Sequence, residues 1–176
     1  MMRIIAGLYG GRIIKAPSGY KTHPMSEKMR GALFNSINDF DGKDVWDAFA
    51  GSGALGLEAL SRGATSVVAT DSDRAAYGVL KDNIQKLKAE NIKAIKAPAK
   101  GWSENNVDKK FDIILCDPPY NNLQLSTVFA LKSHLKPNGL MVLSYPGREP
   151  IPTADGVVVV DNRNYGDGSL AYYQLK

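Results

Sequence analysis

The chain has 176 residues, of which 44% are hydrophobic and 23% charged, a composition typical of one globular domain. Its apolar runs are shorter than the roughly 20 residues that a membrane-spanning helix needs, and its first residues lack the apolar stretch of a signal peptide. The single cysteine, Cys116, excludes an internal disulfide, and His23 and His134 have no partners at metal-ligand spacing. We therefore expect a cytoplasmic protein that binds no membrane and no metal.

The net charge of +4 is concentrated in the first quarter of the chain. Residues 1–43 carry seven Lys or Arg and three Asp or Glu, whereas residues 44–176 carry 15 of each kind. A basic segment attached to a neutral body is typical of proteins that bind a polyanion such as a nucleic acid. The alternative is an ordinary solvated surface on which the charges are unevenly distributed by chance.

Residues 1–25 predict a small β-hairpin followed by a loop, which together form a basic appendage. β-prone runs at Arg3–Gly7 and Gly11–Lys15 flank a turn rich in glycine, and prolines interrupt the residues that follow. Ser26 then provides a helix N-cap. Apolar residues that recur at every fourth position predict an amphipathic helix over Glu27–Asn38.

In the body of the chain, residues 26–176, β-like apolar runs alternate with helix-like stretches. The predicted strands are Val45–Phe49, Ser66–Thr70, Ile92–Ala97, Phe111–Cys116 and Leu140–Ser144, and the predicted helices are Ala54–Arg62, Asp73–Lys88, Lys100–Asn105 and Leu123–His134. This alternation predicts an α/β fold, a Rossmann-like and mostly parallel sheet with helices on both faces. Val157–Asp161 and Leu170–Leu175 have no helix between them and predict a C-terminal antiparallel hairpin.

A glycine-rich motif between the first predicted strand and helix of the body indicates a nucleoside-containing cofactor. Gly51, Gly53 and Gly56 match G-x-G-x-x-G, and Asp71 ends the next strand, where an acid can bind ribose hydroxyls. Asp47 would repel the phosphates of a dinucleotide, which disfavours an NAD oxidoreductase, but it suits the α-ammonium group of S-adenosylmethionine. The predicted cofactor-binding residues are Asp47, Phe49, Gly51, Ser52, Gly53, Gly56, Asp71 and Ser72. Glycines that serve only helix–strand packing, with Asp47 as a strand-end cap, are the structural alternative.

A second motif, Asp117-Pro118-Pro119-Tyr120, follows the predicted strand Phe111–Cys116. The prolines donate no backbone hydrogen bond and fix a rigid, extended turn. The turn offers a carboxylate and free carbonyl oxygens beside a flat ring, an arrangement that suits the planar amine of a nucleobase. Taken alone, it could equally be an Asp-Pro turn with a packed tyrosine. Both motifs are predicted at the carboxyl ends of strands, where doubly wound sheets bind ligands.

Together the two motifs resemble those of class I amino-methyltransferases, which combine Asp-x-Phe-x-Gly-Ser-Gly with (Asp/Asn)-Pro-Pro-(Tyr/Phe). More narrowly, nearly the whole chain resembles the bacterial 16S ribosomal RNA guanine-N2 methyltransferases of the RsmD type. The segments that carry this resemblance are Arg3–Gly7, Gly11-Arg12, Pro24-x-Ser26, Arg30-x-Ala32-Leu33-Phe34-Asn35, Asp47–Ala64 and Asp117–Tyr120. The N-terminal segments are the specific part, because many methyltransferases share the other two motifs.

The resemblance implies S-adenosylmethionine as methyl donor and the exocyclic N2 amine of a guanine in 16S ribosomal RNA as acceptor. Asp117 and the Pro118 carbonyl would accept hydrogen bonds from the amine, Pro119 would stiffen the turn, and Tyr120 would stack on the extruded base. The cations predicted to bind RNA phosphates are Arg3, Arg12, Lys15, Lys21 and Arg30, with Tyr9 or Tyr20 available to stack. We expect a monomer that acts on 16S ribosomal RNA, either free or within a small-subunit assembly intermediate.

Two segments depart from the family pattern. Ala97-Pro98-Ala99 stands where such enzymes usually have an Asp or Asn that binds the cofactor adenine, so this contact must come from the backbone or be missing. Leu143-Ser144-Tyr145 contains no acid near the end of the fifth strand of the body, where the family commonly has one. The departures concern cofactor binding more than the Asp117–Tyr120 turn.

Other functions share these motifs. An N6-adenine methyltransferase of RNA or DNA has both, although this short chain has no room for the target-recognition insert usual in DNA enzymes. A non-catalytic RNA-binding protein of the same fold also remains open. A protein-glutamine methyltransferase is disfavoured, because those enzymes resemble Asn-Pro-Pro-Tyr and this chain has Asp117.

Overall fold

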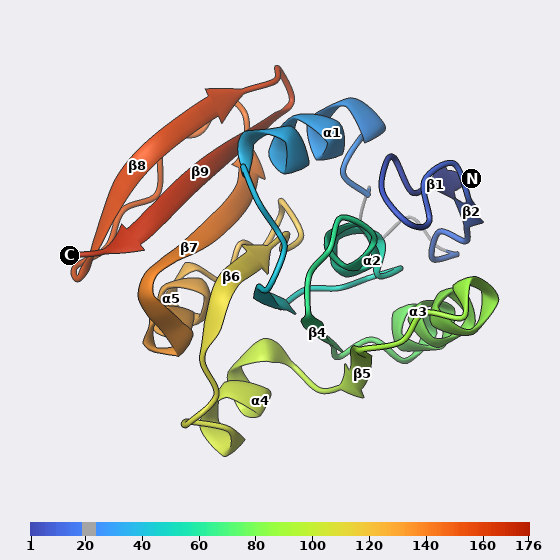
Figure 1. The fold of residues 1–176 in the computed structure, drawn as a ribbon. Coiled ribbons are helices and arrows are strands. Elements are labelled where there is room, and N and C mark those ends of the chain that lie inside the picture. The colour runs from blue at the N-terminus through green and yellow to red at the C-terminus, as the bar shows by residue number, and fades with distance from the viewer. Residues whose placement is uncertain (19–23) are drawn as a thin grey trace.

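Figure 1 shows the computed structural model, which describes residues 1–18 and 24–176. Near the N-terminus, strands β1 (Met2–Arg3) and β2 (Ile13–Ile14) pair antiparallel, and helix α1 (Glu27–Ser36) follows. The remaining elements are β3 (Asp44–Asp47), α2 (Ala54–Ser61), β4 (Ser66–Asp71), α3 (Arg74–Leu87), β5 (Ile92–Lys96), α4 (Ala99–Asn105), β6 (Phe111–Cys116), α5 (Leu125–Ala130), the 3-10 helix η1 (Leu131–His134), β7 (Leu135–Pro146), β8 (Val157–Asn164) and β9 (Gly168–Leu175). Within the described residues, none of the helices has the length and apolar character needed to cross a membrane.

The central sheet has seven strands in the order β5-β4-β3-β6-β7-β9-β8. Strands β3 to β7 run parallel to one another, whereas β9 lies antiparallel between β7 and β8. The chain moves outward from β3 to β5 and then crosses back to β6 on the other side of β3. The carboxyl ends of β3 and β6 are therefore adjacent at the switch point, where α/β sheets bind ligands.

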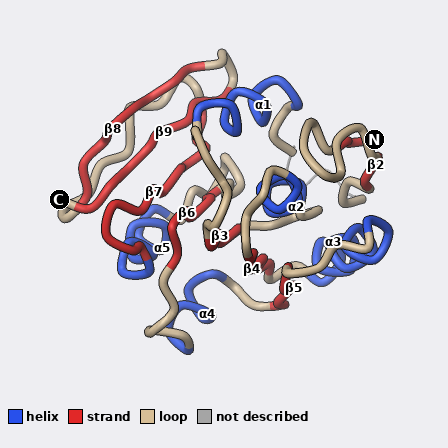
Figure 2. Tube along the Cα trace, in the orientation of Figure 1, coloured by secondary structure: helices blue, strands red, loops and turns tan. Residues whose placement is uncertain are grey.

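Helices cover both faces of this sheet, as the alternation of strands and helices predicted (Figure 2). Successive residues of a strand point to opposite faces. Val45 of β3 lies in the core cluster that includes residues of α1 and α2, and its neighbour Trp46 lies in the cluster that includes residues of α4 and α5. The prediction of a mostly parallel sheet between two helical layers, with a C-terminal antiparallel hairpin, is confirmed.

The predicted boundaries differ from the structure chiefly around β7. Strand β7 begins at Leu135 instead of Leu140, because Leu135 pairs with Phe111 ahead of an irregularity in the ladder. Asn138 lies within this irregularity in the left-handed conformation, with φ 62°, which an asparagine tolerates. At the start of α1, Ser26 is the predicted N-cap, and its hydroxyl accepts a hydrogen bond from Met29 N–H (3.1 Å).

The hairpin predicted at the N-terminus is confirmed but short, because part of its backbone bonds to the body of the protein. Glu58 of α2 is fully buried, and its carboxylate accepts hydrogen bonds from the N–H groups of Ile5 (2.8 Å) and Ala6 (3.1 Å). Ile4 and Ile14 are fully buried in the core cluster that includes α1 and α2. The N-terminal segment, residues 1–18, is thus packed into the body.

Candidate active site

Three aspartates lie at the carboxyl ends of adjacent strands. Asp71 ends β4, Asp47 ends β3 and Asp117 follows β6, and these strands are neighbours in the order β4-β3-β6. The ionised forms of Asp117 and Asp71 both raise the pKa of Asp47, as expected for like charges close in space. The fold therefore brings the two predicted motifs to one edge of the sheet.

The cofactor turn, Gly51-Ser52-Gly53, uses its glycines in two ways. Gly53 has φ +84°, and a Cβ there would lie 2.3 Å from Leu80 Cδ1, so this glycine permits close packing on α3. Gly51 has φ +54° and no heavy atom within 4 Å of the Cβ position, so its surface is open to a ligand. Its N–H donates to Asp71 Oδ2 (2.8 Å), which fixes the turn to the end of β4.

Asp47 is buried and only half satisfied. Its Oδ2 accepts a hydrogen bond from Gly56 N–H (2.9 Å), whereas Oδ1 has no partner. The pKa of Asp47 is raised to about 7, first by burial and then by the charges of Asp117 and Asp71, against the lowering effect of the Gly56 hydrogen bond. An unpaired buried carboxylate oxygen is costly unless a donor or cation reaches it. The α-ammonium group of S-adenosylmethionine would supply both, so the residues present fit this cofactor.

The other predicted cofactor residues take different positions around the turn. The Asp71 carboxylate accepts hydrogen bonds from two turns, since its Oδ1 also binds Asp73 N–H (2.8 Å), and this fixes its orientation. Ser72 is exposed beside it, and Phe49 is partly buried against the α4 and α5 side of the core. The Ser52 hydroxyl faces Met2, with 3.8 Å between Oγ and Sδ, so this side chain is directed toward the N-terminal segment.

The turn after β6 is held by a residue of β7. Ser144 is 1% exposed, and its hydroxyl lies 2.7 Å from the Tyr120 hydroxyl. The pKa of Asp117 is raised to about 6, because burial outweighs the opposing hydrogen bond from Ser144. Pro118 is buried, whereas Tyr120 is 40% exposed, so the ring has a face available to a substrate.

The sequence did not reveal the roles of Ser144 and Gly168. The sequence marks Ser144 only as the place where an acid is missing, whereas in the structure its hydroxyl bonds to the Tyr120 hydroxyl and lowers the pKa of Asp117. Gly168 begins β9, and a Cβ there would lie 2.6 Å from the Tyr120 hydroxyl and 2.9 Å from Met29 Sδ. A side chain at this position would force the ends of Tyr120 and Met29 to move, so the glycine leaves room for the observed position of the Tyr120 hydroxyl.

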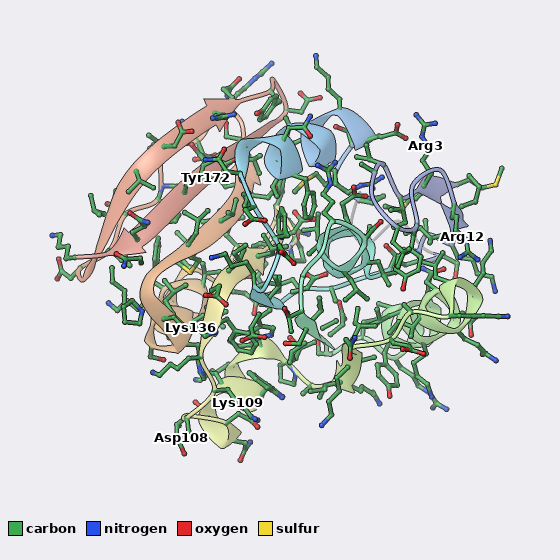
Figure 3. All side chains as sticks on the ribbon, viewed as in Figure 1. Arg3, Arg12, Asp108, Lys109, Lys136 and Tyr172 are labelled. Carbon is green, nitrogen blue, oxygen red and sulfur yellow. The ribbon has the colours of Figure 1, made fainter. Side chains whose placement is uncertain are left out.

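The cations predicted to bind RNA are already engaged within the protein. On the surface, Arg3 pairs with Glu27 (2.6 Å) and Lys15 pairs with Asp82 (3.2 Å). The Arg12 guanidinium donates to the carbonyl oxygens of Lys86 and Leu87 at the end of α3. Figure 3 shows Arg3 and Arg12 on the same side of the molecule, away from Asp108 and Lys109.

Arg30 and Tyr9 do not have the exposed positions that RNA contact would require. Arg30 is 2% exposed, and its Nη2 donates to the Arg3 carbonyl (2.6 Å), while burial lowers the pKa of its guanidinium. Tyr9 is 8% exposed and belongs to the core. The structure thus corrects the expectation that these two side chains face the RNA. Lys21 and Tyr20 lie outside the described residues.

The strand order of the sheet and the unpaired Asp47 oxygen beside its glycine turn fit an S-adenosylmethionine-dependent methyltransferase, and solved methyltransferase structures superpose on the chain. The comparisons with known proteins agree and identify the family. A family model described as "Conserved hypothetical protein 95" matches residues 2–174, and the chain belongs to this family, that of the RsmD-type methyltransferases. The resemblance to the RsmD-type methyltransferase family is confirmed.

Relatives match over nearly the full length of the chain. The "Ribosomal RNA small subunit methyltransferase D" of Haemophilus influenzae is 31% identical over 180 residues, which cover 98% of this chain and 93% of that protein. The structure of yhhF from Escherichia coli superposes with a TM-score of 0.84 at 28% identity, covering 99% of this chain and 98% of the other. A ribosomal protein L11 methylase from Lactobacillus delbrueckii, at 22% identity and TM-score 0.71, shares the fold over 85% of this chain and 78% of its own.

Proposed function

We propose that the protein transfers a methyl group from S-adenosylmethionine to the exocyclic N2 amine of a guanine in 16S ribosomal RNA. The observation that carries the proposal is the position of Asp117, whose carboxylate follows β6 directly beside the end of β3, where Asp47 has an oxygen free for the cofactor. The name of the Haemophilus influenzae relative supports ribosomal RNA as substrate. Guanine N2 follows from the resemblance to RsmD-type enzymes.

The chain's own residues act on the amine. S-adenosylmethionine supplies a methyl group already activated by the positive charge on sulfur. The lone pair of a nucleobase amine is delocalised into the ring, so the protein must make it available. Asp117 and the Pro118 carbonyl accept hydrogen bonds from the two amine hydrogens, which draws the nitrogen toward tetrahedral geometry and stabilises its developing positive charge. Tyr120, held by Ser144, stacks on the base after it has left the RNA helix.

Residues 1–25 are proposed to contact the RNA backbone. Arg3, Arg12 and Lys15 lie on the surface of the N-terminal segment, and Arg12 reaches the end of α3, where Lys86 and Lys88 are also exposed. Such cations attract phosphates whether or not they also pair with a neighbouring acid. Arg30 supports this surface from beneath through its bond to the Arg3 carbonyl. The unit that acts is proposed to be a monomer, on free 16S ribosomal RNA or on an assembling small subunit.

The test separates methyl transfer from cofactor binding. Asp117→Ala is expected to reduce methyl transfer to 16S ribosomal RNA at least about 100-fold, because a positioned electrostatic contact in the transition state is lost. Binding of S-adenosylhomocysteine, measured by calorimetry, is expected to persist. Asp108→Ala is the matched control, because Asp108 is an exposed aspartate that precedes β6, whereas Asp117 follows the other end of this strand. Undiminished transfer by a folded Asp117→Ala protein that binds cofactor would refute the mechanism.

The modified atom is tested in cells. Mass mapping of 16S ribosomal RNA from a strain that lacks the protein is expected to show the loss of one N2-methylguanosine. Loss of an N6-methyladenosine instead would favour the adenine alternative. An unchanged modification pattern would remove 16S ribosomal RNA as the substrate.

A further inference from the structure

One side chain of α3 holds the cofactor turn, Gly51-Ser52-Gly53. Asn83 is fully buried, and its Nδ2 donates to the carbonyl oxygen of Ser52, the central residue of the turn (2.9 Å). Buried amide groups are normally hydrogen-bonded, and this bond gives the turn a fixed polar contact on α3. Leu80, one helical turn earlier, adds an apolar contact with Gly53.

The same amide also holds the N-terminal segment. Asn83 Oδ1 accepts a hydrogen bond from Lys15 N–H (2.8 Å), and Nδ2 donates to the Lys15 carbonyl (2.9 Å). Asn83 therefore satisfies both backbone groups of one residue in the segment and one carbonyl in the turn. Near the other end of the segment, Met2 Sδ lies 3.8 Å from the Ser52 hydroxyl. Both ends of the segment are thus connected to the same residue of the cofactor turn.

We propose that Asn83 is a positioning residue that couples the N-terminal segment to the cofactor turn, so that RNA on the segment and S-adenosylmethionine at the turn each strengthen the binding of the other. The RNA side of the coupling rests on the proposed function. Three hydrogen bonds share one side chain, so a ligand that orders either partner also orders the amide for the other partner. Coupling between two binding sites is reciprocal by thermodynamic necessity.

The structural link can be measured without RNA and without catalysis. Hydrogen exchange followed by mass spectrometry would be compared with and without S-adenosylhomocysteine, in a peptide that covers residues 12–18. The ligand is expected to slow exchange at Lys15 by about threefold or more in the wild type, because its N–H bonds to Asn83. Asn83→Ala is expected to abolish this response.

The coupling to RNA is measured by calorimetry with a 16S ribosomal RNA transcript. The RNA is expected to tighten S-adenosylhomocysteine binding about fivefold in the wild type. In Asn83→Ala, binding of S-adenosylhomocysteine is expected to be about tenfold weaker, with no response to RNA. Asn83→Asp is the second variant, because it keeps the size and the Oδ1 acceptor but loses both donated bonds.

The matched control changes the segment without touching the turn. Ser61 of α2 accepts a hydrogen bond from Tyr9 N–H (2.9 Å) and donates to the Ala6 carbonyl (2.6 Å). Ser61→Ala therefore loosens the same segment at another point, and it is expected to leave cofactor affinity and the response to RNA in place. An equal loss of cofactor affinity in this control would show that Asn83 has no special role.

The outcomes for the coupling and for the proposed function are distinguishable. If exchange at Lys15 in the wild type is the same with and without S-adenosylhomocysteine, the coupling is overturned, even if the protein methylates ribosomal RNA. This measurement needs no variant, so it decides the matter even if both Asn83 variants fail to fold. If the exchange response is present but the protein does not methylate 16S ribosomal RNA, the proposed function fails and the link through Asn83 stands.

Discussion

Ser144→Ala should shift the pH dependence of methyl transfer to higher pH. Burial raises the pKa of Asp117 to about 6, even though a hydrogen bond from the Ser144 hydroxyl lowers it. Only the ionised Asp117 carries the negative charge that stabilises the positive charge developing on the amine, so activity is lost as pH falls through its pKa. Removing the hydroxyl takes away a hydrogen bond to the charged form, and the ionised fraction at a given pH therefore falls.

The size of the shift follows from the strength of one such bond. A hydrogen bond to a charged group contributes about 1.5 kcal/mol or more, and a change of about 1.4 kcal/mol moves a pKa by about one unit. Near pH 6 the wild-type carboxyl is about half ionised, so a rise of about one unit leaves roughly a tenth ionised. We expect the rate of Ser144→Ala at pH 6, relative to its own plateau, to be about fivefold below that of the wild type. Above about pH 8 the two proteins should differ much less.

The assay measures kcat/KM for 16S ribosomal RNA between pH 5 and pH 9 at saturating S-adenosylmethionine. Any effect of the bound cofactor on the pKa of Asp117 is then present in every variant that is compared. Tyr120→Phe is the matched control, because it removes the other partner of the Ser144 hydroxyl and leaves the bond to Asp117. We expect Tyr120→Phe to change the height of the profile without moving it. Identical midpoints for Ser144→Ala and the wild type would refute the role given to this hydroxyl.

Other perturbations test the cofactor turn, the buried carboxylate and the docking of the N-terminal segment. Gly11→Ala and Gly53→Ala both force alanine to a positive φ (+81° and +84°), but only the Cβ added at Gly53 would also lie 2.3 Å from Leu80 Cδ1. In urea denaturation, Gly53→Ala should therefore lower the free energy of unfolding by about 2 kcal/mol more than Gly11→Ala does. Asp47→Asn should raise the Tm of the ligand-free protein at pH 8 but not at pH 4. The pKa of Asp47 in the folded protein is about 7, so ionisation of this carboxyl costs stability as pH rises from about 4 to about 7. Calorimetry of the same variant should show cofactor binding weakened at least about tenfold. Glu58→Ala should lower the free energy of unfolding in urea by about 3 kcal/mol, because the N–H groups of Ile5 and Ala6 and the Arg62 guanidinium lose the carboxylate that they bind. Limited proteolysis of this variant should then cut within residues 1–18.

The sequence predicted the sheet and the cofactor turn because both leave local signals. Strands and helices show themselves through the period of their apolar residues, and Gly51 and Gly53 mark a backbone conformation that other residues rarely adopt. Asp47 could be interpreted as a partner for a cation from its place ahead of the glycines. Its unpaired oxygen, however, becomes visible only when α2 is packed against β3.

The docking of the N-terminal segment could not be predicted in the same way. Glu58 and Asn83 stand within helices, where a polar residue usually faces water, and their partners at Ile5 and Lys15 lie more than fifty residues away. Contacts between backbone and side chain at such separations produce no periodic pattern. For the same reason Arg30 was expected on the surface, whereas tertiary packing buries it beneath the Arg3 carbonyl.

The aspartates of the active site lower the stability of the folded protein and also stabilise the positive charges of the reaction. Asp47, Asp71 and Asp117 stand at three adjacent strand ends, and burial keeps the pKa values of Asp47 and Asp117 well above those of ordinary aspartates. In the ligand-free protein, the burial of these carboxylates and the repulsion among them reduce the free energy of unfolding. A cationic cofactor beside Asp47 relieves this repulsion. The amine beside Asp117 relieves it too, and most strongly in the transition state, where the amine gains positive charge. The same carboxylates that destabilise the empty site therefore favour the cofactor and the transition state over the ground state.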